Sequence, residues 1–198
     1  AAVLLRGNDF EISENELAVG GRMIDVRTER AVYKELPLPL HGQHQGDNAS
    51  IALTAVEEFF GNVLDVEVVR EGFAAVRMPG RFEVLGRAPL VVIDGAHNPA
   101  GADVCAQVFF DDFSPEGKRI LVVGALKGRD PQMLLSALRA DEFDVVICCT
   151  APTPRGIGAN DVASAAKQMG CEQVVVCETV EIACDKALNI AREEDAVL

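Results

Sequence analysis

The chain has 198 residues, is 49% apolar, and carries 31 acidic against 18 basic residues, which gives a net charge of −13. This length predicts one or two domains, and the apolar share excludes a disordered chain. The acidic balance disfavours nucleic acids and anionic membranes, and we expect neither as a partner. No run reaches the roughly 20 apolar residues of a membrane helix. We expect a cytoplasmic protein and a monomer.

The six cysteines show no metal-binding spacing. No two of them form a CxxC pair, and the three histidines stand at no zinc-finger distance from them. Most lie in apolar or helical runs, which predicts buried free thiols in a reducing compartment. We therefore expect no metal ligand among these residues.

The first part of the chain, residues 1–78, predicts a β-meander followed by two helices. Short apolar runs at 2–5, 22–26 and 31–36 alternate with Gly, Asn and Asp turn signals, and Pro37 and Pro39 close the last run. Apolar residues then recur with helical spacing over 48–60 and stop before Gly61. A shorter helix is expected over 66–75.

Strands alternate with helices after residue 78, and we place a domain boundary there. Continuously apolar, β-branched runs such as QVVVC are typical of strands buried on both faces. The fold class is therefore α/β, with a mainly parallel sheet and right-handed crossovers in residues 79–198. Strands are expected at 82–85, 89–93, 118–123, 143–149, 173–177 and from 196, with helices at 100–110, 131–139, 160–169 and 180–191.

The stretch VVIDGAHNPAG, residues 91–101, places polar groups at the end of a buried strand. Ligands of open α/β sheets bind outside the carboxyl ends of the strands, so Asp94 is expected to face a ligand. Its carboxylate can accept two ribose hydroxyls, and His97 can donate to a phosphate or carboxylate. Pro99 suits the first turn of a helix, whose amides attract anions. Alternatively, Asp94 and Asn98 only cap that helix.

Further candidate residues stand in three other segments. His44 and Asn48 are four residues apart at an expected helix start and can face one ligand, although Asp47 or Asn48 can equally be an N-cap. Arg81 lies in the turn before the second domain, where a guanidinium can clamp phosphate oxygens. Arg155, in TAPTPRGIG, can bind a small carboxylate. For both arginines the alternative is an exposed surface side chain.

Two nucleotide-binding motifs are absent from the sequence. No GxGxxG follows a first strand, since GIGAND at residues 156–161 lacks the third glycine, and no GxxxxGK[ST] occurs. These residues therefore contain no loop that cradles a triphosphate by itself.

Taken together, the motifs resemble the C-terminal part of the folylpolyglutamate synthases, including the forms that are also dihydrofolate synthases, within the Mur ligase superfamily. The resemblance is carried, in order, by LPLPLHGQHQGDNASIALTAVEEFFG, PGRFEVL and VVIDGAHNPAG. LKGRDPQMLL and residues 150–155 fit the pattern more loosely. The resemblance covers essentially the whole chain, and the three motifs in this order are specific, whereas each alone is weak.

This resemblance implies an ATP-dependent amide ligase that phosphorylates a carboxylate and then joins L-glutamate to it, using ATP and Mg²⁺. The first part of the chain would end a central α/β ATPase domain, and the second would be a Rossmann-like C-terminal domain. By resemblance, Asn48 would contact the nucleotide base region, Arg81 the phosphates and Asp94 the ribose. His97 would lie near the reacting phosphate and the incoming glutamate. His44, Asn98 and Arg155 are further candidates for contacts to the folate, dihydropteroate or glutamate substrates.

The sequence also departs from that family, because the glycine-rich phosphate loop, the Mg²⁺ ligands, the carbamylated lysine and a TGSLY-like segment are missing from these residues. We expect the chain to need an N-terminal part of the same protein and to have no ligase activity alone, since positioning and charge stabilisation need both halves of a site. The alternatives are a non-catalytic Rossmann-like module that binds a nucleotide or small acid, and another Mur-type ligase.

Overall fold

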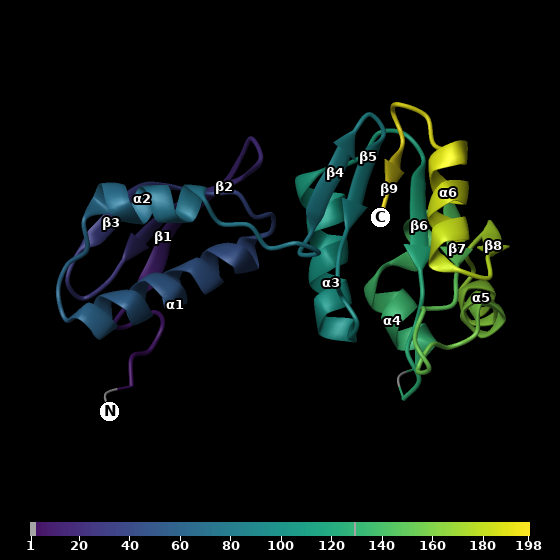
Figure 1. Ribbon diagram of the computed structural model, residues 1–198, viewed down its shortest axis with the longest axis horizontal. Coiled ribbons are helices and arrows are strands. Elements are labelled where there is room, and N and C mark those ends of the chain that lie inside the picture. Colours follow the sequence, from purple (N-terminus) through teal and green to yellow (C-terminus); the bar gives the residue numbers. More distant parts are fainter. Residues whose placement is uncertain (1–2, 129) are drawn as a thin grey trace. The chain divides into compact units, whose positions relative to one another are not determined.

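The computed structural model describes residues 3–128 and 130–198. The chain divides into two compact units, Ala1–Arg81 and Phe82–Leu198, called unit 1 and unit 2 below (Figure 1). The division falls close to residue 78, where the sequence places the domain boundary. Each unit is described by itself.

Unit 1 is an antiparallel meander packed against two helices. Strands β1 (Glu11–Ala18), β2 (Gly21–Arg27) and β3 (Val32–Leu38) follow one another in the sheet, and α1 (Gln43–Phe60) and α2 (Val66–Ala74) complete the unit (Figure 1). The predicted meander with two helices is confirmed. The chain reverses between β1 and β2 at Gly20, whose φ of 84° is one that side chains rarely adopt.

The first strand does not lie where the sequence predicted it. Residues 3–5 form no strand, residue 2 lies outside the described residues, and β1 instead covers EISENELA at Glu11–Ala18. This edge strand has exposed and half-buried positions only, so it offers no apolar run to detect. Strand β3 also runs through Pro37, because an outer strand tolerates a residue without an amide hydrogen.

Helix α1 begins at Gln43, five residues before the predicted start at residue 48. The first turn of α1 is polar, so the apolar periodicity of the sequence does not reveal it. The turn is held by packing instead, since Gln45 and Gly46 are buried and Gly46 lies closely against β1. The residue at the N-cap is Gly42, without a side-chain bond, so the interpretation of Asp47 or Asn48 as an N-cap is wrong. The predicted end is confirmed.

A buried hydrogen bond crosses the core of unit 1. The Tyr33 side chain, only 1% exposed, donates from its hydroxyl to Glu57 Oε1 at 2.6 Å and accepts from the Leu64 amide at 3.0 Å. The surrounding core is apolar, with Ile24, Val26, Leu36, Leu53 and Val69 among its members. Because a buried polar group without a partner is costly, the tyrosine and the glutamate depend on each other.

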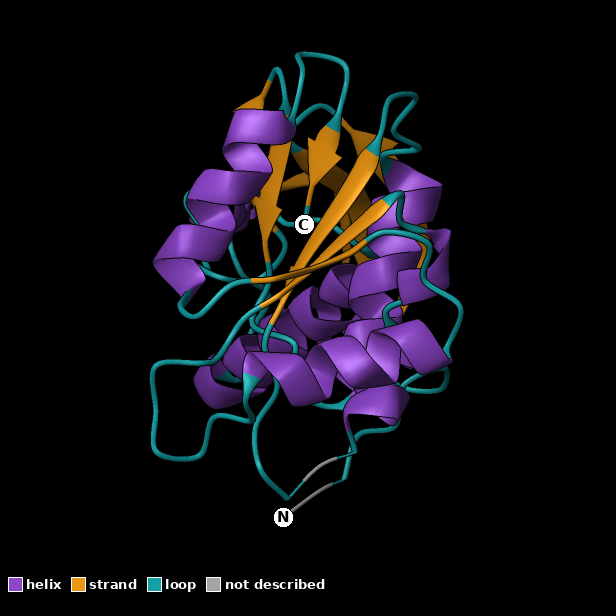
Figure 2. Cartoon of the chain, turned by 90° about the vertical axis from the view of Figure 1, so that its right-hand side faces the viewer, coloured by secondary structure: helices purple, strands orange, loops and turns teal. Residues whose placement is uncertain are grey.

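Unit 2 is a six-stranded sheet with helices on both faces (Figures 1 and 2). The strand order is β4-β5-β9-β6-β7-β8; β4 is antiparallel to β5 and the other pairs are parallel, which confirms the predicted α/β class with a mainly parallel sheet. The strands are β4 (Glu83–Arg87), β5 (Leu90–Ile93), β6 (Arg119–Val123), β7 (Val145–Cys148), β8 (Val174–Val176) and β9 (Ala196–Val197).

The helices of unit 2 follow the predicted order. They are α3 (Pro99–Gln107), α4 (Pro131–Ala137), α5 (Ala159–Gln168) and α6 (Val180–Ile190), with a π-helical turn at Val108–Asp112 after α3 and a 3₁₀ turn at Ala140–Glu142. All predicted strands and helices of this part of the chain are present, with small shifts at their ends.

Alternate side chains along the strands pack into two separate cores, one on each face of the sheet. Leu121 and Val146 point into the core under α3, α4 and α5, whereas Ile120 and Ile147 point into the core under α6. Since every side chain of the inner strand β7 is buried, the continuous apolar runs are explained by helices on both faces. Of the six cysteines, five are buried free thiols, as predicted, and Cys184 is exposed.

We predict that unit 1 loses stability at alkaline pH because of Tyr33. Burial, followed by the hydrogen bond to Glu57, raises the pKa of Tyr33 above its ordinary value of 10.0. A raised folded-state pKa stabilises the fold fully below the unfolded pKa, and this stabilisation is lost as the pH rises through the folded-state pKa. Urea denaturation, followed by fluorescence of this single tyrosine, should show a falling free energy of unfolding above pH 10.

The variant Tyr33→Phe is the matched control, because it keeps the buried ring and removes the hydroxyl. We expect it to lose about 1–3 kcal/mol at neutral pH, since Glu57 loses its donor, and to lose the alkaline dependence, both measured by circular dichroism. A phenolate that titrates at the ordinary pKa while unit 1 stays folded would contradict the prediction.

Candidate functional site

Asp94 stands directly after β5 and is fixed through both carboxylate oxygens. Its Oδ2 accepts a hydrogen bond from the Phe82 amide, and its Oδ1 accepts one from the Ala96 amide, each at 2.7 Å. The first bond reaches back across twelve residues to the start of β4, and the second closes the turn after β5. The side chain is half-buried. Its position at the carboxyl end of a parallel strand is the one expected for a ligand-binding residue.

Asn98 is the N-cap of α3, and this part of the capping interpretation is confirmed. Its Oδ1 accepts from the Gly101 amide at 2.8 Å, and Pro99 occupies the first helical position. Asp94 does not cap the helix, because its partners are the amides of Phe82 and Ala96. Asp94 and Asn98 therefore have separate structural roles: the carboxylate fixes the turn after β5, and the amide caps α3.

His97 lies between these two anchored residues and is exposed. Its Nδ1 is 3.1 Å from the Gly95 carbonyl oxygen. A ring held through Nδ1 can present Nε2 to a ligand, with the tautomer set by the first contact. The turn thus offers a carboxylate and an imidazole within four residues.

The loops after β6 and β7 lie at the same edge of the sheet and are tied together. The Lys127 amide donates to the Arg155 carbonyl at 2.6 Å, and the Ile157 amide donates to the Ala125 carbonyl at 2.9 Å. Arg155 is exposed. Strand β7 is three positions from β5 in the sheet, which at parallel strand spacing separates the two strand ends by about 14 Å. A ligand that contacts both loops has to span that distance.

The remaining candidates belong to unit 1. His44 and Asn48 lie one turn apart on α1, inside the helix, so they share a face as the sequence suggested. Asn48 is exposed, and its Nδ2 donates to Gln45 Oε1 at 3.3 Å, whereas His44 is half-buried. Arg81 is exposed and closes a turn through its amide, which donates to the Met78 carbonyl at 3.2 Å.

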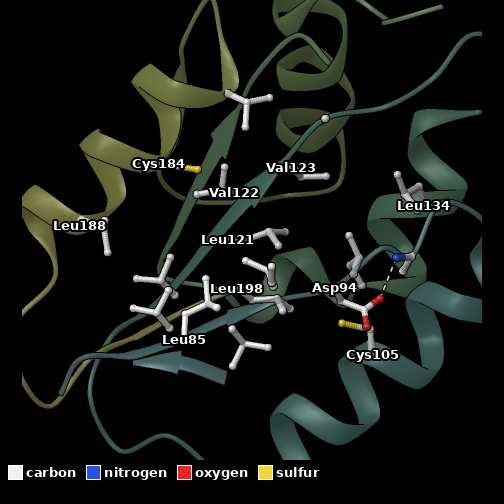
Figure 3. A pocket seen from close by; sticks show the side chains of 18 residues that line it. Leu85, Asp94, Cys105, Leu121, Val122, Val123, Leu134, Cys184, Leu188 and Leu198 are labelled. Atoms are coloured by element: carbon white, nitrogen blue, oxygen red, sulfur yellow. Dashed lines mark hydrogen bonds between the residues drawn. The ribbon is translucent and has the colours of Figure 1, made fainter. Parts of the chain in front are cut away.

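A cavity of about 390 Å³ opens beside Asp94 (Figure 3). Its walls are mostly apolar, and Cys105 of α3 lies next to the carboxylate. Burial, and then the charge of Asp94, raises the pKa of the Cys105 thiol well above its ordinary range, so the thiol stays neutral and is no nucleophile. Sequence reasoning missed this wall, because Cys105 and Leu134 line the same cavity as Asp94 only through the packing of α3 and α4.

Within residues 3–128 and 130–198, no group of three or more His, Cys, Asp or Glu side chains is placed to hold a metal ion. No helix of this part of the chain is long and apolar enough to cross a membrane. At the end of β5, the Asp94 carboxylate can accept hydrogen bonds from hydroxyl groups, and the His97 imidazole can donate one to an anionic group.

A doubly covered, mainly parallel sheet with polar groups after its strands is the architecture of an α/β ligand-binding domain. Residues 80–198, more than half of the chain, match the family model described as Mur ligase, glutamate ligase domain. The chain therefore belongs to the Mur ligase family, and the resemblance seen in its motifs is confirmed.

The individual relatives are folate enzymes. The chain is 37% identical to the dihydrofolate synthase/folylpolyglutamate synthase of Mycobacterium tuberculosis, over 99% of this chain and 41% of that protein. The solved structure of Mycobacterium tuberculosis folylpolyglutamate synthase complexed with ADP covers 97% of this chain, with a TM-score of 0.89 and 35% identity. Escherichia coli FolC in complex with DHPP and ADP covers 98%, with a TM-score of 0.80 and 27% identity.

The chain spans less than half the length of these relatives: 41% of the Mycobacterium tuberculosis protein, and 45% and 43% of the chains in the two structures. A further structure, of a bifunctional folylpolyglutamate synthase/dihydrofolate synthase, has Mn, AMPPNP and L-glutamate bound. It covers 97% of this chain with a TM-score of 0.77 and 28% identity.

We predict that Asp94→Asn destabilises unit 2 even without any ligand. An asparagine keeps one acceptor oxygen but turns an amino group toward one of the two backbone amides, which leaves that amide without an acceptor. The expected loss is about 1–3 kcal/mol in urea denaturation followed by circular dichroism. The control is Asp103→Asn on α3, an exposed aspartate, which should stay within about 0.5 kcal/mol of the parent. A loss in Asp94→Asn that is no larger than the loss in Asp103→Asn would contradict this prediction.

Proposed function

We propose that the chain is part of an ATP-dependent amide ligase that adds L-glutamate to folates and, in a bifunctional enzyme, to dihydropteroate. The family match and the 37% identical relative support this proposal. The observation that carries it is the turn after β5, in which Asp94 is anchored by two amides and followed at once by His97 and the capped helix α3.

In this proposal the Asp94 carboxylate accepts hydrogen bonds from the ribose hydroxyls of ATP. A carboxylate has about four acceptor sites, and the two amide bonds leave capacity for two more donors. Arg81, by its guanidinium, would hold the phosphates, and Asn48 would contact the base region.

The proposed reaction has two steps. A carboxylate oxygen of the folate or dihydropteroate substrate attacks the γ-phosphorus of ATP, the bond to the β-phosphate oxygen breaks, and ADP leaves. The amino group of L-glutamate then attacks the carbonyl carbon of the acyl phosphate, and the tetrahedral intermediate expels phosphate to give the amide. Mg²⁺, when bound, would neutralise charge on the phosphates; its ligands would come from another part of the full-length protein.

His97 would act in the second step. The incoming amine must lose a proton as the amide forms, and the exposed ring, fixed through Nδ1, can present Nε2 near the reacting phosphate. His44, Asn98 and Arg155 remain candidates for substrate contacts. For Arg155 the fitting group is a carboxylate of glutamate, since a guanidinium binds a carboxylate through two parallel hydrogen bonds.

The ribose contact is tested in the full-length enzyme with ATP and 2′-deoxy-ATP. Because the parent carboxylate accepts from the hydroxyls, we expect kcat/KM to fall about tenfold with the deoxy nucleotide. In Asp94→Asn the ratio of kcat/KM with ATP to kcat/KM with 2′-deoxy-ATP should fall toward one. In the control Asp103→Asn, at an exposed residue, the ratio should stay as in the parent. Because the readout is a ratio on one protein, a loss of folded enzyme cancels. An unchanged preference in Asp94→Asn would remove Asp94 from the nucleotide site.

These 198 residues alone should show no ATP-dependent glutamate addition. The chain spans 41% of its Mycobacterium tuberculosis relative and contains no GxxxxGK[ST] loop, so positioning and charge stabilisation of the phosphates are incomplete. The measurement is ADP release with dihydropteroate and with tetrahydrofolate, each with L-glutamate, beside the full-length enzyme as positive control. Turnover by the short chain would overturn the proposed division of the site.

A further inference from the structure

The loops after β6 and β7 form a short two-stranded ribbon beyond the carboxyl edge of the unit 2 sheet (Figure 1). Leu126 and Gly156 are bridge partners in antiparallel orientation. In an antiparallel pair the partner positions move in opposite directions along the two chains, so Lys127 lies directly opposite Arg155. The 2.6 Å hydrogen bond from the Lys127 amide to the Arg155 carbonyl agrees with this register.

The backbone of this ribbon brings two cationic side chains together. Directly opposed residues of an antiparallel pair point to the same side, with their Cβ atoms about 5 Å apart. The side chains of Lys127 and Arg155 therefore start as neighbours. Two glycines fix the ribbon: Gly128 has a φ of 87°, which side chains rarely adopt, and a Cβ at Gly156 would lie 2.5 Å from the Ala151 carbonyl oxygen.

Neither cation is neutralised by a carboxylate in the described part of the chain. Both side chains are exposed, and none of the ion pairs found there includes them. The acid nearest to them in sequence, Asp130, accepts from the Gln132 amide at 2.9 Å as the N-cap of α4. The Lys127 ammonium has a long contact, 3.5 Å, to the Pro154 carbonyl. Such a pair is unexpected in a chain of net charge −13, because like charges directly opposite each other are destabilising.

We propose that Lys127 and Arg155 form a dicarboxylate clamp, which binds the two carboxylates of the incoming L-glutamate and makes the enzyme specific for a dicarboxylic amino acid. This inference rests on the proposed ligase function and adds Lys127 to the residues that select its substrate. The guanidinium binds one carboxylate in a bidentate contact, and the ammonium binds the other as a point charge. Both side chains are long, so their charged ends can separate to reach the two ends of one glutamate.

A dianion fits this pair better than a monoanion does. Two carboxylates neutralise both cations, whereas an amino acid with an uncharged side chain leaves one cation without a counter-ion. The pair also attracts an anion locally, which the negative charge of the chain as a whole repels. The clamp lies at the sheet edge where Asp94 and His97 stand, since β6 is two positions from β5 in the sheet, or about 10 Å at the usual strand spacing.

The clamp is tested in the full-length enzyme by steady-state kinetics with L-glutamate and with L-glutamine, its uncharged isostere. We expect Lys127→Gln to raise the KM for L-glutamate about tenfold or more, because a charge-assisted bond to the substrate is lost. The ratio of kcat/KM with L-glutamate to kcat/KM with L-glutamine should fall by a similar factor. The KM values for ATP and for tetrahydrofolate should stay as in the parent.

Two further variants are the controls for this change. Lys127→Arg keeps the positive charge, so its KM for L-glutamate should lie closer to the parent than that of Lys127→Gln. Lys186→Gln removes an exposed lysine of α6 and should keep all parent values.

A second measurement separates substrate binding from a structural role. In the ligand-free full-length enzyme, Lys127→Gln should leave the Tm unchanged or raise it. The substitution keeps the backbone bond to Arg155 and removes one of two opposed like charges. A lowered Tm would identify a structural lysine and overturn the clamp.

Each kinetic result also decides the proposal. A rise confined to the KM for L-glutamate, and largely reversed in Lys127→Arg, supports the clamp. An unchanged KM for L-glutamate, an equal rise in the KM for ATP, or an equal rise in Lys127→Arg overturns the clamp in an enzyme that still adds glutamate, and leaves the proposed ligase function intact. A parent enzyme that adds no glutamate to any folate overturns the proposed function, and the clamp with it.

Discussion

The two hydrogen bonds accepted by the Asp94 carboxylate are the contacts on which the candidate site depends. Phe82, whose amide makes one of them, is buried, and its ring packs against Phe113 at 5.2 Å between centroids. Its backbone φ is 42°, in the left-handed region that a bulky side chain rarely adopts. A residue in such a conformation persists only where its surroundings hold it, and here the core holds the ring and Asp94 holds the amide. The position of the carboxylate is therefore set by the packing of unit 2.

The sheet supplies the second constraint, because its central strands are covered on both faces. Side chains of β6 and β7 alternate between the cores under α3–α5 and under α6, so these strands have no solvent face to carry polar groups. Polar chemistry is consequently displaced to the loops that follow the strands. That is where Asp94, His97 and Arg155 stand, and the β6 and β7 loops are fixed to each other by backbone hydrogen bonds.

The sequence predicted the fold of unit 2 well and that of unit 1 less well, for a physical reason. Strands buried on both faces appear in the sequence as continuous apolar runs, and every one of them was predicted. Strand β1 has one exposed face and a charged composition, and the first turn of α1 is polar, so neither shows in an apolar pattern. The turn after β5 was identified from its residues, including the cap at Asn98. The partner amide of Asp94, from Phe82, and the thiol of Cys105 depend on tertiary packing and carry no local signal.

The structural and the proposed chemical roles of Asp94 are compatible because of how a carboxylate accepts hydrogen bonds. Two of about four acceptor sites bind the backbone, and the others suit two ribose hydroxyls. The neighbouring thiol of Cys105 remains neutral, so it adds no competing charge. An amide side chain would lose one acceptor oxygen, and a longer carboxylate would displace the turn that Ala96 closes. Because the Asp94 side chain is half-buried, a hydrogen bond that it accepts from a ribose hydroxyl would be stronger than the same bond in water. A single residue type, aspartate, thus meets the demands of the fold and of the proposed nucleotide at this position.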